Sequence, residues 1–400
     1  MTQYDVIVVG ARCAGSPTAM LLARQGYRVL LVDRARFPSD VVSTHLIHPQ
    51  GVARLEAWGL LDRVVATGCP PIDTYSFDFG PLTIAGSPGT AAHPVAYGPR
   101  RTVLDKLLVG AAAEAGAEVR EGFNVDEVQI ADGRAVGIRG RDADGRPVTE
   151  QARVVVGADG VHSMVARAVG AEPYRDQPRL LCGYYAYWSG LPTGSAWEVF
   201  ARPERGMAAF ATNDDLTLVI ACWPYAEMKA NTVDLEASYL DTLARAPEFA
   251  ERVHAGQRVT RIVGSAVPNF FRIPYGPGWA LVGDAGYNRD FVTAQGISDA
   301  FRDAEHCAQA LHAALSEKQP YATAMDGYHR ARDAAVLPMY EMTVDLATLQ
   351  PPTPKMQQLL VAVAGNREAM DGFARANSGI DSPDRFFNSD NIGKIFAAAQ

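Results

Sequence analysis

Six residues near the start of the chain could hold the phosphates of a dinucleotide. They form the stretch Gly10-Ala11-Arg12-Cys13-Ala14-Gly15, which follows a short apolar run and precedes residues with helical spacing. In a G-x-G-x-x-G loop, the first glycine permits a tight turn and the third lets the helix pack close to the strand. Phosphates then bind at the helix N-terminus, where free N–H groups favour anions. Arg12 replaces the middle glycine, and its guanidinium carries a charge that suits phosphates.

An acidic residue lies where the ribose of such a ligand is expected. Asp33 follows Gly15 by 18 residues, at the end of the apolar run Val29–Asp33. An acid at this place accepts hydrogen bonds from ribose hydroxyls and repels a 2′-phosphate. Strand, loop, helix and acid occur in the order of a β-α-β unit, so the sequence predicts a parallel sheet that carries a dinucleotide site.

A later segment indicates which dinucleotide is bound. A predicted strand ends at Asp284, and after a polar loop a helix is predicted to begin near Gln295 and Gly296. The free N–H groups and the positive dipole end of such a helix suit the N1–C2=O edge of a flavin, where negative charge accumulates on reduction. An acid just before the helix can bind the ribityl hydroxyls. These features favour FAD over NAD.

Three sequence blocks together resemble the FAD-dependent monooxygenases of the aromatic-hydroxylase type, the group A flavoprotein hydroxylases. They read GARCAG…VDR, VVVGADGVHSMVAR and ALVGDAGYNRDFVTAQGISDAFRDAE, and RTVLDKLL resembles the R-x-x-L stretch that lies between the first two in the family. The match covers roughly residues 4–345. Phe291 departs from the family, which usually has a proline beside the flavin ring.

The resemblance implies a set of cofactor contacts and a reaction. The residues assigned to FAD are Gly10, Ala11, Arg12, Ala14, Gly15, Asp33, Arg34, Arg101, Val125, Asp159, Gly160, Asp284, Gln295, Gly296 and Ile297. NADPH or NADH is implied as a transient reductant, and no second glycine-rich βαβ loop is present for it. O₂ is then expected to give a flavin C4a-hydroperoxide, which hydroxylates an aromatic or polycyclic small molecule in a dry pocket.

Two histidines are candidates for acid–base work. His45 and His48 occur in STHLIHPQG, a region that passes close to the flavin in relatives. A histidine can deprotonate a phenol near neutral pH, although a purely structural role is open for each. The aromatic segment LCGYYAYWSG is open to two interpretations in the same way, as a flat wall for a ring-bearing substrate or as sheet core.

Other functions share this cofactor. A reductase or oxidase of the geranylgeranyl-reductase type, a flavin epoxidase and a flavin-binding protein without catalysis remain alternatives. A flavin-dependent halogenase is disfavoured, because no lysine precedes Lys106 and YAYWSGLP does not match W-x-W-x-I-P.

Composition excludes several partners. The net charge of −8 argues against nucleic acid and anionic membranes, which require a basic face. Five scattered cysteines without C-x-x-C spacing predict neither disulfides nor a metal site. The first strand begins at Tyr4, which leaves no room for a signal peptide, and no apolar run is long enough for a membrane helix. A cytoplasmic location is expected.

The predicted fold class is α/β, with a discontinuous Rossmann-like FAD-binding domain. This domain is expected to comprise residues 1–70, 100–172 and 263–345, and a strand-rich substrate domain to comprise residues 71–99 and 173–262. A helical tail is expected over residues 346–400, and the preceding helix from about Tyr321 is predicted to break at Pro338. The tail could cover the substrate domain or form a homodimer contact, and simple packing on the chain's own core is favoured.

Overall fold

The first sheet is built from short runs rich in valine, isoleucine and leucine, as expected for strands buried on both faces. In the computed structural model, which describes residues 3–398, its strands are β1 (Tyr4–Val9), β2 (Val29–Asp33), β7 (Glu118–Glu121), β8 (Asn124–Ala131), β9 (Arg134–Arg141), β10 (Pro147–Gly157), β19 (Tyr275–Gly276) and β20 (Trp279–Leu281). The order is β19-β20-β10-β1-β2-β7, and β1 pairs in parallel with both β2 and β10. The carboxyl ends of these parallel strands therefore meet at one edge.

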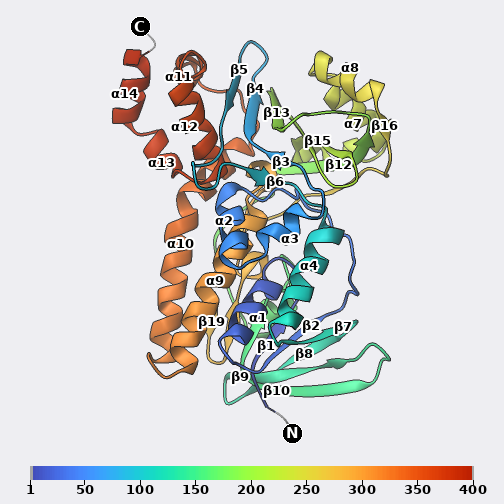
Figure 1. Ribbon diagram of the computed structural model, residues 1–400, viewed down its shortest axis with the longest axis vertical. Helices are drawn as coiled ribbons and strands as arrows, with labels where there is room; N and C mark the ends of the chain where they lie inside the picture. Colours follow the sequence, from blue (N-terminus) through green and yellow to red (C-terminus); the bar gives the residue numbers. More distant parts are fainter. Residues whose placement is uncertain (1–2, 399–400) are drawn as a thin grey trace.

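Helices cover one face of this sheet (Figure 1). They are α1 (Gly15–Arg24), α2 (Pro49–Ala57), α3 (Leu61–Val65), α4 (Arg101–Glu114) and α9 (Gly296–Leu315), with α10 (Tyr321–Leu346) packed on α9. The β8–β9 hairpin and α5 (Met164–Ala168) lie against the other face. Both faces of β1 are thus buried, and the glycine-rich loop is held between sheet and helices.

The second sheet is largely antiparallel and lies at the opposite end of the molecule (Figure 1). Its strands are β4 (Thr74–Asp78), β5 (Thr83–Gly86), β12 (Leu181–Ser189), β13 (Ala196–Arg202), β14 (Arg205–Ala211), β15 (Leu216–Pro224), β16 (Gln257–Arg258) and β17 (Val263–Ser265). The order is β16-β12-β15-β14-β13-β4-β5, with β17 beside β12. The predicted α/β class with a strand-rich second part is confirmed.

Short elements join the two sheets. They are β3 (Pro71–Ile72) with β6 (Ala96–Tyr97), the small sheet β11 (Pro173–Gln177), β18 (Asn269–Arg272) and β21 (Tyr287–Asn288), and the 3₁₀ turns η1 (Tyr225–Glu227), η2 (Gly283–Ala285) and η3 (Phe291–Thr293). η2 follows β20, and η3 comes directly before α9. The junction between the sheets is therefore formed partly by the segment that leads into α9.

Side chains alternate along β12, so this strand has two different environments. Leu181, Tyr185 and Tyr187 pack in the cluster that faces η3 and the tail. The intervening side chains, Tyr184 and Trp188 among them, face the helices α6 (Met228–Asn231), α7 (Leu235–Leu243) and α8 (Pro247–Ala255). Tyr184 and Trp188 are therefore core residues, and only the first face of β12 is directed toward the junction.

The tail forms four helices, α11 (Pro354–Ala364), α12 (Arg367–Ser378), α13 (Pro383–Phe386) and α14 (Ser389–Ala398). α11 and α12 pack on β5, at the end of the second sheet (Figure 1). The expected break at Pro338 is wrong, because α10 continues through this residue. Val336, Met339 and Tyr340 are buried on either side of the proline, and this packing offsets the backbone hydrogen bond that proline cannot make. In residues 3–398, none of the helices has the length and apolarity that a membrane span requires.

Candidate active site

The glycine-rich loop has the close contacts that its glycines predict. Gly10 has a φ of +104°, and a Cβ added there would lie 2.4 Å from the carbonyl oxygen of Ala158. A Cβ at Gly15 would lie 1.7 Å from the carbonyl oxygen of Gly10. Larger residues at either position would push the loop away from β10 or from α1.

Free backbone donors are present where α1 begins. Within residues 3–398, the N–H groups of Arg12, Cys13 and Ala14 donate to no other group, whereas the N–H of Ala11 donates to Asp33 Oδ2 at 2.7 Å. Asp33 Oδ1 also accepts from the N–H of Ala35 at 2.8 Å. These bonds fix the carboxylate at the end of β2 and leave lone pairs for further donors. The loop thus presents donors suited to phosphates and an acceptor suited to a ribose.

The side chain of Arg12 is bound to neighbouring elements. Its guanidinium donates to Asp105 Oδ2 at 2.5 Å and to Ser39 Oγ at 3.0 Å. Asp105 lies in the first turns of α4 and is fully buried, and its Oδ1 also accepts from Arg101 Nε at 3.0 Å. The sequence analysis missed Asp105, although its i, i+4 spacing from Arg101 was a usable signal.

Arg101 and Asp284 approach each other from different parts of the chain. Arg101 begins α4 and lies close enough to Asp284 to lower the pKa of that carboxyl, but burial and the nearby acids Asp299 and Asp303 outweigh it. The net effect raises the pKa of Asp284 from 3.8 to about 6. The Asp284 side chain is nevertheless exposed, although protein surrounds it on most sides. A carboxylate that is surrounded by protein but open to solvent is suited to binding a polar ligand.

The start of α9 has an exposed glycine and free backbone N–H groups. Gly296 is exposed, and apart from its chain neighbours and the nearby backbone of its own helix, no described residue lies within 4 Å of where its Cβ would be. The N–H groups of Gly296 and Ile297 donate to no group in residues 3–398. Gln295 is buried, and its amide joins α9 to α12 and α2 by donating to the Asn377 carbonyl at 2.9 Å and accepting from Gln50 at 3.0 Å.

The other predicted contacts have different surroundings. Asp159 Oδ2 accepts from the N–H groups of Met164 and Val165 at 2.6 and 3.1 Å, so this carboxylate caps α5. Gly160 has a φ of +78° and open space beside it. Val125 is half-buried in β8, and Arg34 is exposed just after β2. Direct FAD contacts by these four residues, like those by the other residues assigned to FAD, stay predictions.

His45 is buried at the junction of the two sheets. It has a φ of +61°, its Nε2 bonds to the hydroxyl of Tyr187, and its Nδ1 has no partner in the described residues. Burial and the charges of Arg101 and Arg100 lower its pKa from 6.5 to about 3. His45 is therefore neutral at physiological pH.

His48 is buried nearby with both ring nitrogens occupied. Its Nε2 donates to the Thr293 carbonyl at 3.0 Å, so its Nδ1 accepts from the hydroxyl of Tyr75 at 2.6 Å. Burial lowers its pKa to about 4. These contacts join η3 to β4 and favour a positioning role, while catalysis by either histidine stays a prediction.

A small apolar cavity lies between the second sheet and η3. Its volume is about 60 Å³, and its lining includes Trp197, Phe210, Ile220, Phe291 and Ala294. Thr44, the neighbour of His45, also borders it. The cavity therefore adjoins the start of α9, where the flavin ring is expected.

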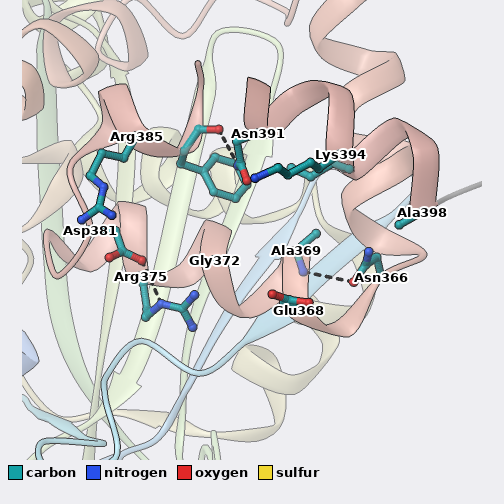
Figure 2. Close-up of a pocket in the computed structure, with 12 residues that line it drawn as sticks. Asn366, Glu368, Ala369, Gly372, Arg375, Asp381, Arg385, Asn391, Lys394 and Ala398 are labelled. Carbon is teal, nitrogen blue, oxygen red and sulfur yellow. Dashed lines mark hydrogen bonds and ion pairs between the residues drawn. The ribbon is translucent and has the colours of Figure 1, made fainter. Parts of the chain in front are cut away.

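A second cavity, of about 360 Å³, lies among the tail helices (Figure 2). Arg375 donates to Asp381 at 2.9 Å, Asn366 caps α12, and the Asn391 amide donates to the Phe386 carbonyl. Much of its polar lining thus serves the helices themselves. In the described part of the chain, no group of His, Cys, Asp and Glu residues is arranged to hold a metal ion, and the five cysteines are free and buried.

The arrangement fits FAD on several independent observations. Free N–H groups lie at the starts of both α1 and α9, Asp33 lies at the end of β2, and Asp284 in η2 is exposed. The phosphates of a dinucleotide require N–H donors at one end of the site. The flavin requires the positive end of a helix at the other. Residues 10–15, Asp33, Arg101, Asp284 and 295–297 are the group that would hold it.

Comparison with known proteins supports FAD as the cofactor. The family model of the FAD binding domain matches residues 3–343. The chain is 26% identical over 365 residues to digeranylgeranylglycerophospholipid reductase 1 of Methanopyrus kandleri, covering 87% of this chain and 91% of that protein. It is 28% identical over 382 residues to the phenazine 1,6-dicarboxylic acid hydroxylase PhzS of Lysobacter antibioticus, covering 84% and 91%.

A solved structure shares the fold over the whole chain. The myxobacterial chondrochloren halogenase CndH superposes with a TM-score of 0.82 at 22% identity, covering 100% of this chain and 97% of that chain. The resemblance expected from the three sequence blocks is confirmed. The chain belongs to the FAD binding domain family and is an FAD-dependent oxidoreductase.

Proposed function

We propose that this protein is an FAD-dependent monooxygenase that uses NADPH or NADH and O₂ to hydroxylate an aromatic or polycyclic small molecule. The observation that carries the proposal is the apolar cavity beside η3, which is lined by Trp197, Phe210 and Phe291. It borders the segment leading into α9, whose free N–H groups suit the flavin ring. The hydroxylase among the relatives supports the same activity.

Bound FAD supplies the redox chemistry, and the chain supplies position and electrostatics. When FAD is bound, the N–H groups of Gly296 and Ile297 at the start of α9 would donate to the edge of the ring where negative charge accumulates. The apolar lining of the cavity excludes water from the reacting groups. His45, neutral and with a free Nδ1, is proposed to accept a hydrogen bond from the substrate rather than to remove a proton outright, because its low pKa makes it a weak base.

A reductase of isoprenoid double bonds is the second candidate. It is favoured by the relative that is named as a digeranylgeranylglycerophospholipid reductase and that matches 87% of this chain. An apolar cavity would also suit an isoprenoid chain. The two candidates differ in their need for O₂, because a reductase adds hydrogen to its substrate and no oxygen.

The test is isotopic. The FAD-loaded protein is supplied with NADPH, then NADH, under ¹⁸O₂, together with a panel of neutral aromatic and isoprenoid compounds. A hydroxylated product that carries ¹⁸O is expected. A saturated product that forms equally well without O₂ would establish the reductase instead.

A further inference from the structure

We propose that Phe291 sets the size of the ring system that the apolar cavity admits, and that the group bound there is uncharged. The inference rests on the proposed function, which places the substrate beside the flavin ring. Phe291 is the first residue of η3 and lies between the second sheet and α9.

The lining of the cavity indicates the charge of the ligand. Its side chains come mainly from β13, β14 and β15, and include Val199, Met207, Leu218 and Ile220. None of the lining residues carries a charge, and Thr44 is the lining residue with a hydroxyl. A buried carboxylate or ammonium without a partner is strongly unfavourable, so the group that enters is neutral.

The ring of Phe291 occupies the space left by the missing side chain of Gly183 in β12. Gly183 lies on the face of β12 that it shares with Leu181 and Tyr185, where both neighbours carry large side chains. A Cβ at Gly183 would lie 2.5 Å from Cζ and 2.6 Å from Cε2 of Phe291. Glycine is thus required at position 183, because the ring of Phe291 occupies the space that a larger side chain would fill.

The cavity is too small to hold a substrate ring beside the present position of the Phe291 ring. About 60 Å³ is available, whereas an apolar cavity of about 150 Å³ holds one benzene ring. Phe291 is half-buried rather than fully buried. We infer that a substrate ring enters by displacing this phenyl group.

The backbone of Phe291 is held firmly. Asp290 Oδ1 accepts from the N–H of Val292 at 3.1 Å, and the N–H of Asp290 donates to Asn269 Oδ1 at 2.6 Å. Ala294 closes the turn with a φ of +53° and donates to the Phe291 carbonyl at 2.8 Å. The side chain, rather than the segment, is the part that can adjust.

The test measures binding of probes to the FAD-loaded protein. Phenol, 2-naphthol and 2-naphthoate are titrated against the unmodified protein and the variants Phe291→Ala, Phe291→Leu, Gly183→Ala and the double variant Gly183→Ala/Phe291→Ala. Tryptophan fluorescence, to which Trp197 in the cavity lining contributes, and flavin absorbance report binding. Phe396→Ala, a half-buried position in α14, controls for loss of a phenylalanine, and circular dichroism checks folding.

We expect Phe291→Ala to bind 2-naphthol at least tenfold more tightly relative to phenol, with Phe291→Leu in between. Gly183→Ala is expected to weaken the binding of 2-naphthol several-fold, because the added methyl group pushes the ring of Phe291 into the cavity. The double variant is expected to regain tight binding, since the clash no longer exists. 2-Naphthoate is expected to bind at least tenfold more weakly than 2-naphthol throughout.

An unchanged ratio of 2-naphthol to phenol affinity in Phe291→Ala would overturn the role of Phe291. Binding of 2-naphthoate as tight as that of 2-naphthol, or no binding of any probe, would overturn the neutral cavity. Oxygenated product with an unchanged affinity ratio would refute this inference alone. The expected binding pattern without oxygenated product would refute the monooxygenase proposal alone.

Discussion

Asp105 accepts hydrogen bonds from two arginines that come from different elements. Arg12 reaches it from the glycine-rich loop and Arg101 from the first residue of α4. Asp105 itself is fully buried, and it also lies 3.5 Å from the thiol of Cys13. Arginine in place of the middle glycine is therefore tolerated because its charge has a buried partner.

Replacing Asp105 by alanine is expected to destabilise the protein by about 3–5 kcal/mol, because two guanidinium groups lose a buried partner. FAD content of the purified variant is expected to fall with it, since Arg101 is no longer held toward Asp284. Urea unfolding and released flavin measure the two effects. Glu305→Gln is the matched control, because its bond to Arg54 is half-exposed and contributes less than about 1 kcal/mol. Equal losses in both variants would contradict the account.

The raised pKa of Asp284 predicts that the stability of the FAD-free protein depends on pH. Its pKa is raised from 3.8 to about 6 on folding, so the folded state holds the proton more tightly than the unfolded state. This contribution to stability is complete below about pH 4 and is lost as the pH rises through about 6. Asp284→Asn is therefore expected to raise the unfolding temperature at pH 7.5 and to leave it unchanged near pH 4. A difference independent of pH would contradict the pKa shift.

At the scale of elements, α9 depends on contacts with two other helices. Gln295 bonds to Asn377 of α12 and to Gln50 of α2, just before the N–H groups that face the expected flavin. Gln295→Ala removes both bonds and is expected to cost about 1–2 kcal/mol of stability and to speed FAD dissociation several-fold. Flavin fluorescence after dilution measures that rate. Gln309→Ala, exposed on the same helix, is expected to change neither.

The elements of the site were largely predictable from the sequence. The run from Tyr4 to Asp33 has a local pattern of strand, glycine loop, helix and acid, and each is found where expected. Pro338 was misjudged, because burial of its helix outweighs a local preference. The contacts of Asp105 with Arg12 and of Phe291 with Gly183 join residues far apart in the chain. No local pattern encodes such pairs.

At the scale of the whole molecule, the tail helices pack against the second sheet. Phe373 of α12 packs 5.2 Å from Phe77 of β4 and 5.8 Å from Phe386 of α13, measured between ring centres. A Cβ at Gly86 of β5 would lie 2.3 Å from the Met370 carbonyl oxygen. These contacts agree with the favoured expectation that the tail packs on the chain's own core.

Phe373→Ala is expected to destabilise the protein by about 3–5 kcal/mol, because it leaves a cavity between tail and sheet. Calorimetry is expected to show one transition that shifts as a whole. Val361→Ala in α11, where the side chain is 62% exposed, is expected to have little effect. A separate transition for the tail, moved alone by Phe373→Ala, would contradict this packing.

The central claim is that FAD binds across the glycine-rich loop and the start of α9. The most direct measurement is the amount and identity of flavin released from the purified protein, compared with Gly15→Ala. The account predicts about one FAD per chain in the unmodified protein and almost none in Gly15→Ala, whose methyl group would clash with the Gly10 carbonyl. Gly110→Ala, with no contact closer than 3.8 Å, should keep its FAD. A protein without flavin, or equal FAD in Gly15→Ala, would contradict the account.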